Sequence, residues 1–175
     1  MLAIALLGAV WVSQALAFLP FATAAHLDPG YRGVCEGCDL SGRIMAGAHM
    51  TNSVFDRADF SDAVLARADA SGSSFEAADF TSADLSHARL VDAHCRNAVF
   101  AGATLAQVDA RRANFRRARF DRADVSAVNF AGADISGADL RTAEGLTQAQ
   151  LDTACGDRRT RLPPGMHVPA CLRSH

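Results

Sequence analysis

The chain has 175 residues, enough for one domain, and half of them are apolar although few are aromatic. Its 17 basic residues, all of them arginine, nearly balance its 19 acidic residues and leave a net charge of −2. Charge alone therefore indicates neither a nucleic-acid-binding protein nor a protein that binds a strongly acidic substrate.

The N-terminal segment resembles a secretory signal peptide. Residues 2–12 form an uninterrupted apolar run that is short for a membrane span, and small-x-small motifs follow at residues 15–17 and 22–24. We expect a signal peptide over residues 1–24, with cleavage after Ala17 or Ala24, and a periplasmic or secreted protein. Because no Lys or Arg precedes the apolar run, an uncleaved inner-membrane anchor and an intracellular N-terminus are kept as alternatives.

Residues 25–37 form a lead-in, and a CxxC motif, Cys35-Glu36-Gly37-Cys38, spans its junction with the segment that follows. A redox motif of this kind needs a strand before it and a helix after it, so that the helix N-terminus stabilises a thiolate. Here the motif runs directly into a repeat, so we predict a structural disulfide or buried thiols, with redox chemistry and metal binding as alternatives. The chain has five cysteines, an odd number, so at least one stays free or pairs with another molecule.

Residues 38–145 repeat every five residues without an insertion. A central position, at residue 40 and every fifth residue to 140, is mostly Leu or Phe; the residue two before it is mostly Ala, and the residue one before it is often Asp or Asn. Residues two apart lie on the same side of an extended backbone, so the Ala and the centre both point inward. A period of five suits a chain that turns a corner every few residues, which predicts a narrow solenoid.

This pattern resembles the pentapeptide repeat family, whose consensus is A-[DN]-[LF]-x-x. The resemblance implies an all-β fold, a right-handed quadrilateral β-helix of four blocks per coil and about five coils. Centres twenty residues apart would then stack in internal columns, one of which holds Phe60, Phe80, Phe100 and Phe120. Because adjacent coils lie about 4.8 Å apart, we expect these rings to stack.

The C-terminal segment 146–175 is expected to cover the end of the solenoid, which would otherwise expose apolar surface and backbone groups. Thr147 and Gln150 match a capping box and predict a short helix from residue 148 to about residue 155. Leu146 and Leu151 match a hydrophobic staple, and Gly156 is placed to end the helix.

Three prolines in the tail predict an irregular or extended chain after that helix. The segment also resembles the one that closes many exported bacterial pentapeptide repeat proteins. A disulfide between Cys155 and Cys171 would tie the tail back to the helix.

Charge is unevenly distributed along the repeats. Residues 56–92 hold eight acidic residues against three arginines, whereas residues 111–122 hold six arginines against one acid. This arginine band, the candidate binding surface for an anionic envelope component or protein, consists of Arg111, Arg112, Arg116, Arg117, Arg119 and Arg122. The simpler interpretation is a solvated surface on which each arginine forms a weak ion pair with an aspartate.

The sequence contains no recognisable catalytic, cofactor or metal constellation. It has no Ser–His–Asp set and no phosphate-binding glycine loop, and its six histidines share no column of the solenoid. Cys95 occupies a centre and is expected to be a buried small apolar residue. Asp39, Asp59 and Asp79 fall in one outward column, where we expect them to accept hydrogen bonds from nearby backbone.

These observations favour a non-catalytic exported structural or protein-interaction module, present as a monomer or an end-to-end dimer, with an unidentified partner. The family resemblance implies one alternative, a DNA-mimicking protein that binds type II topoisomerases and protects them from quinolones. That activity needs a long acidic surface and a cytoplasmic location. The arginine band and the export signal disfavour it, and we expect no nucleic-acid partner.

Overall fold

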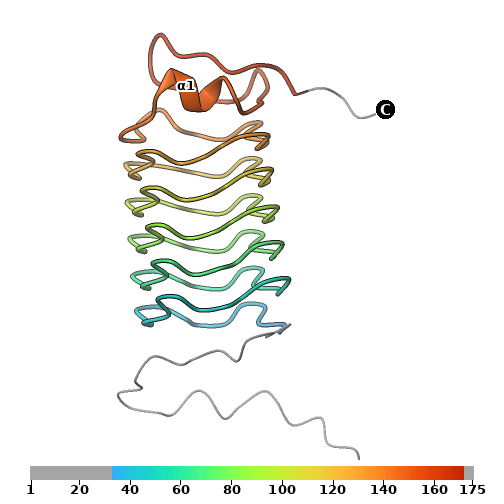
Figure 1. Cartoon of the computed structure of the whole chain (residues 1–175), viewed down its shortest axis with the longest axis vertical. Helices are drawn as coiled ribbons and strands as arrows, with labels where there is room; N and C mark the ends of the chain where they lie inside the picture. The colour runs from blue at the N-terminus through green and yellow to red at the C-terminus, as the bar shows by residue number, and fades with distance from the viewer. Residues whose placement is uncertain (1–32, 172–175) are drawn as a thin grey trace, which may run out of the picture.

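The computed structural model describes residues 33–171, so the predicted signal peptide 1–24 and most of the lead-in lie outside the described residues. Within this range the chain winds into a column of stacked coils (Figure 1). Parallel β-bridges join residues twenty apart, such as Asp59 with Asp79. The Phe60 N–H donates to the Asp79 carbonyl at 2.7 Å, and the Asp79 N–H donates to the Ala58 carbonyl at 3.0 Å. Each coil is therefore hydrogen-bonded to the next.

A tight turn closes each five-residue block. In one such turn the Ala58 N–H donates to the Phe55 carbonyl at 3.1 Å, and Arg57 has a φ of 60°. A positive φ at the third residue is the type II arrangement. The same corner recurs every five residues from Gly37 to Gly137, so each twenty-residue coil has four corners. Between corners only one residue per side forms a bridge, and residues 33–171 contain no longer strand.

The interior of the coils is filled by the centres and the small residues two positions before them. The rings of Phe60, Phe80, Phe100 and Phe120 are buried and stack with successive centroid separations of 4.8, 5.0 and 5.1 Å. The predicted ladder of four rings is confirmed. A neighbouring column meets it edge to face, as Phe115 does against Phe120 at 5.6 Å. Burial of each ring stabilises the fold by about 1.5–3 kcal/mol.

Where Asp or Asn precedes a centre, its side chain binds the next corner. Asp79 Oδ1 accepts hydrogen bonds from the Thr81 N–H at 2.8 Å and from its hydroxyl at 2.5 Å. Asp59 Oδ1 accepts one from the Ser61 N–H at 2.8 Å, and Asp39 contacts Ser41 in the same way. The outward aspartate column predicted from the sequence therefore holds local backbone, as expected.

Helix α1, Gln148–Leu151, lies at the C-terminal end of the column (Figure 1). Thr147 is its N-cap and forms the predicted capping box with Gln150. The Gln150 amide also donates to the carbonyls of Val125 and Val128, at 2.8 and 3.1 Å, so the helix satisfies backbone groups of the coil beneath it. Both leucines of the predicted staple, Leu146 and Leu151, are buried.

The helix is shorter than predicted, and Gly156 does not end it. Its last residue is Leu151, because Cys155 already pairs with Asp134 as part of the next coil. Gly156 instead forms a bridge with Ala170. Gly156 has the position of a residue that ends a helix. The residues before it leave the helix earlier, because the chain there pairs with the coil below.

The tail continues the solenoid over its C-terminal end. Arg161 pairs with Asp139 at a spacing of 22 residues, and the bridge from Cys155 to Asp134 has a spacing of 21. Val34 pairs with Val54 at the other end, so the ladder extends beyond residues 38–145 on both sides. Between its isolated bridges the tail consists of turns and irregular backbone, so the prediction of an irregular or extended tail is confirmed. No helix within residues 33–171 has the length and apolar character that crossing a bilayer requires.

Candidate binding surface

The predicted arginine band runs around one coil instead of covering one face. Arg111 and Arg112 occupy one corner, Arg116 and Arg117 occupy the next, and Arg122 occupies a third. A single flat partner therefore cannot contact the whole band at once.

Four of the six arginines of the band form ion pairs. The nitrogen–oxygen separations are 2.8 Å for Arg111–Asp109, 2.6 Å for Arg112–Asp92, 3.2 Å for Arg116–Asp134 and 2.8 Å for Arg119–Asp121. The hydrogen bond from Arg112 lowers the pKa of Asp92, and the one from Arg111 lowers the pKa of Asp109. For these four arginines the simpler interpretation, a solvated surface of ion pairs, describes the structure well.

The remaining two, Arg117 and Arg122, form no ion pair with any residue of the described range 33–171. Both stand at the second corner position with positive φ, on different corners of the coil. The band therefore consists of four arginines that are paired with aspartates and two arginines that are not.

Three further arginines, which lie in the tail and were not predicted to belong to the band, are close to it in the structure. Because the tail pairs with the last coil, it brings Arg158, Arg159 and Arg161 next to Arg117 and Arg119. These residues line a hollow of about 540 Å³ together with Ala118, Gly137 and Asp139. A second hollow, of about 910 Å³, is lined by Arg116, Ser136, Gly156, Asp157, Arg158, Arg159, Val168, Ala170 and Cys171.

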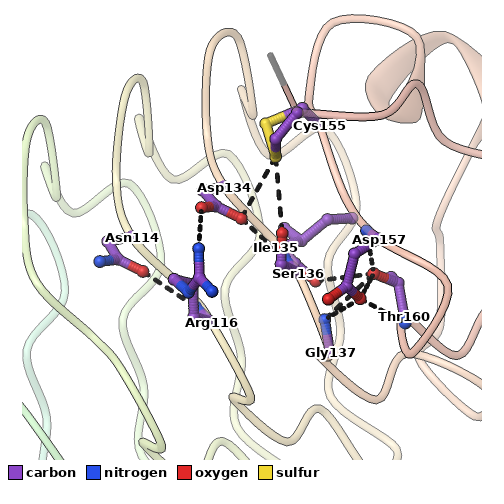
Figure 2. Close-up of polar contacts among 10 residues, drawn as sticks. Asn114, Arg116, Asp134, Ile135, Ser136, Gly137, Cys155, Asp157 and Thr160 are labelled. Carbon is purple, nitrogen blue, oxygen red and sulfur yellow. Dashed lines mark hydrogen bonds and ion pairs between the residues drawn. A yellow bond between two sulfur atoms is a disulfide. The ribbon is translucent and has the colours of Figure 1, made fainter. Parts of the chain in front are cut away.

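Asp157 holds the loop that carries Arg158 and Arg159 onto the last coil. Its Oδ1 accepts hydrogen bonds from the Gly137 N–H at 2.9 Å and the Thr160 N–H at 3.1 Å (Figure 2). It also accepts one from the Arg159 N–H at 2.9 Å. Burial by itself raises the pKa of Asp157, but these donors outweigh that effect and the pKa is lowered overall. The carboxylate is therefore ionised at neutral pH and fixes the backbone of the loop.

A disulfide between Cys155 and Cys171 closes the tail, and its contacts are shown in Figure 2. The Cys171 sulfur lies 3.4 Å from Asp134 Oδ1 and 3.5 Å from Ser136 Oγ. Asp134 and the two sulfurs lie within 4.8 Å of one another, as three metal ligands would. A disulfide has no thiolate that could bind a metal. With Cys155 and Cys171 oxidised, this cluster is therefore structural and acts as a clasp that fastens the tail.

The CxxC cysteines Cys35 and Cys38 are also joined by a disulfide, at the first described coil. Cys95 is left unpaired and is fully buried at a centre. Burial raises the pKa of its thiol, so it stays protonated and packs as an apolar residue, as predicted.

Comparison with known proteins agrees with the repeat. The family model of pentapeptide repeats matches eight copies, over residues 35–64, 58–94, 93–130 and 111–144. No curated protein matches the sequence.

Several solved structures are similar to this chain. A pentapeptide repeat protein from the Arabidopsis thaliana thylakoid lumen is 32% identical, with 65% of this chain and 72% of that chain covered and a TM-score of 0.39. The pentapeptide repeat protein Rfr23 from the cyanobacterium Cyanothece 51142 is 23% identical, with coverage of 74% and 90% and a TM-score of 0.30. QnrB1, a plasmid-mediated fluoroquinolone resistance protein, is 17% identical, with coverage of 78% and 89% and a TM-score of 0.34.

Proposed function

The chain belongs to the pentapeptide repeat family, and on this premise we propose that it is a non-catalytic exported module whose basic C-terminal end binds an anionic partner. Membership of the family implies the right-handed β-helix expected from the sequence. The observation that carries the proposal is the gathering of Arg117, Arg158 and Arg159 beside Gly137, where none of the three forms an ion pair within residues 33–171.

The non-catalytic part of the proposal is supported by what the polar groups already do. Aspartates such as Asp59 and Asp79 hold corners of the solenoid, and Cys95 is enclosed in the core. Catalysis needs a nucleophile, acid or base that can reach a substrate. Asp59, Asp79 and Cys95 are engaged in building the fold.

Export is supported by the two disulfides and by the signal-like segment at residues 1–24. Disulfides form and persist in oxidising compartments and are rare in the cytosol. A module that keeps both Cys35–Cys38 and Cys155–Cys171 oxidised suits the periplasm or the outside of the cell.

Envelope fractionation combined with N-terminal sequencing tests the location. We expect the mature chain to begin after Ala17 or Ala24, to be recovered from the periplasm or the medium, and to contain no free thiol except Cys95. A full-length chain recovered from the cytoplasm with reduced cysteines would contradict the proposal.

Co-sedimentation with purified cell envelopes tests the binding. We expect the protein to sediment with the envelopes at low salt and to be released as salt is raised, because the attraction is electrostatic. An Arg117→Gln/Arg159→Gln variant should remain in the supernatant while its thermal unfolding is unchanged. Envelope binding that is insensitive to both salt and this variant would overturn the proposed surface.

A further inference from the structure

We propose that the two arginine-lined hollows beside Gly137 form one continuous site for a linear glycan that carries phosphate or sulfate groups. The inference rests on the proposed function and deepens it, because it names the chemistry of the partner and the residues that bind it.

Gly137 creates the opening of the site. It occupies a corner with a φ of 70°, and a Cβ built on it would lie 3.4 Å from Arg117 Cγ and 3.8 Å from Arg159 Cβ. The two arginine stems therefore flank the glycine, one from the coil below and one from the tail. Twenty and forty residues earlier in the same column the position carries Arg117 and Asn97, so the missing side chain leaves a notch between two cations.

The cations around the notch are free to bind a ligand. Arg117, Arg158 and Arg159 form no ion pair and no side-chain hydrogen bond within residues 33–171. Each guanidinium then offers its planar set of N–H donors, which matches two oxygens of a phosphate or sulfate. Arg111 and Arg112, by contrast, already satisfy this geometry with Asp109 and Asp92.

The shape favours a chain over a flat surface. Arg158 and Arg159 line both hollows, so the hollows adjoin and share one wall. Together they are lined by six arginines and two aspartates. A linear polymer can place successive anionic groups in adjoining concavities, whereas a membrane surface would touch only the side chains that protrude.

The site is also held in place before a ligand arrives. The Asp157 carboxylate binds the N–H groups of Gly137 and Arg159, and the Cys155–Cys171 disulfide closes the tail behind it. A preformed arrangement of donors loses less entropy on binding than a mobile one.

Isothermal titration of the mature protein tests the proposal with four probes: dextran sulfate, a phosphomannan, uncharged dextran and phosphatidylglycerol vesicles. The first two separate sulfate from phosphate as the anionic group. We expect binding to at least one of the charged glycans and none to uncharged dextran. Vesicle binding tighter than glycan binding would overturn the proposal in favour of a lipid surface.

Two triple variants test whether glycan binding depends on the arginines of this site or only on the total positive charge. Arg117→Gln/Arg158→Gln/Arg159→Gln should weaken glycan binding at least tenfold. Arg43→Gln/Arg67→Gln/Arg122→Gln removes the same charge from three arginines that line neither hollow and likewise form no ion pair within residues 33–171, and should weaken it less than threefold. Equal losses would overturn this site but leave an anionic partner in place, whereas a wild-type protein that binds neither glycan nor envelopes would overturn both.

A third variant changes the shape and leaves the charge alone. Gly137→Gln fills the notch, and the backbone tolerates glutamine at this turn position, because Gln107 adopts a φ of 60° at the equivalent position of another corner. Its matched control is Gly102→Gln, at a φ of 64° on another coil. We expect a tenfold loss for Gly137→Gln and wild-type binding for the control, with unchanged circular dichroism for both. Wild-type binding by Gly137→Gln would show that the notch is not the site.

Discussion

Phe100 lies in the middle of the ring ladder, where the contribution of one core side chain can be measured directly. Its ring stacks on Phe80 at 5.0 Å and on Phe120 at 5.1 Å, and meets Phe115 edge to face at 5.9 Å. We predict that Phe100→Ala lowers the free energy of unfolding by about 3–5 kcal/mol, because it removes buried apolar area and leaves a cavity between two coils. Urea denaturation measures this change.

Phe100→Leu is the matched control, since it keeps most of the apolar volume but loses the ring stacking. Its cost should be clearly smaller than that of Phe100→Ala. A loss below about 1 kcal/mol for the alanine variant would contradict a core based on this ladder.

Asp79 allows the corner hydrogen bond to be tested separately from the core. Its Oδ1 binds both the N–H and the hydroxyl of Thr81. Asp79→Ala removes this acceptor and should cost about 1 kcal/mol in urea denaturation. Asp79→Asn retains a side-chain carbonyl oxygen and should recover most of the loss. An Asp79→Ala variant as stable as the wild type would show that this acceptor does not stabilise the corner.

The conformation of the corners is the residue-scale feature that the sequence analysis missed. The sequence did contain a signal, because every glycine between residues 37 and 137 stands at the second position after a centre. The signal is weak because fourteen non-glycine residues adopt the same positive φ, Arg57 and Asp62 among them. A hydrogen bond to the next coil offsets the strain, as the Arg57 N–H does with the Glu76 carbonyl at 2.8 Å.

At the scale of elements, the disulfide Cys155–Cys171 should stabilise the C-terminal cap. It joins residues 16 apart, and closing a loop of about this length stabilises a protein by about 3 kcal/mol in the chain-entropy model. We predict that Cys155→Ser/Cys171→Ser increases amide hydrogen exchange at Gly156 and in the tail while the coils around Phe100 keep their protection.

Cys35→Ser/Cys38→Ser is the control for that experiment, because its loop spans only three residues and lies at the opposite end. It should leave exchange in the C-terminal cap unchanged. Faster exchange throughout the column in the Cys155/Cys171 variant would contradict a local role for the clasp.

The cap also shows where the sequence stops predicting the structure. The capping box at Thr147 is a local rule, and it placed the start of α1 correctly. The end of the helix depends on the bridge between Cys155 and Asp134, which no local rule contains. The helix also shifts the coil spacing from 20 to 21 and 22 residues, so column arithmetic could not place Arg158 and Arg159 beside Arg117.

At the scale of the whole molecule, stability should fall in acid. Five aspartates have lowered pKa values: Asp39, Asp92, Asp109, Asp139 and Asp157. In the first four the largest cause is a hydrogen bond from a nearby side chain, given by Ser41, Arg112, Arg111 and Arg141 respectively. A carboxyl with a lower pKa when folded binds protons preferentially in the unfolded chain, so its stabilisation is present above the unfolded pKa of about 4 and is lost as pH falls through the folded value.

Thermal unfolding followed at pH 7, 5, 4 and 3 measures this effect. We expect a nearly constant melting temperature down to pH 5 and a decline below pH 4. A melting temperature that does not change between pH 5 and pH 3 would contradict the assigned hydrogen bonds to these aspartates.

The distribution of charge over the whole column bears on the topoisomerase alternative. The acidic residues 56–92 are followed by the band and by the arginines of the tail, so the surface lacks the continuous negative charge of DNA. We predict that the mature protein neither inhibits supercoiling by DNA gyrase nor relieves its inhibition by a quinolone. Either effect at micromolar protein would revive that alternative.

The spacing of twenty residues between stacked positions limits how such a gene can change in length. Inserting or deleting one block of five between Arg117 and Gly137 would turn everything downstream by a quarter of a revolution, so Gly137 would no longer stand over Arg117. Adding twenty residues would lengthen the column by about 4.8 Å and return every later residue to its former side. Duplications that keep the fold should therefore add whole coils of twenty residues. A designed change in the length of the column should likewise add or remove twenty residues at a time.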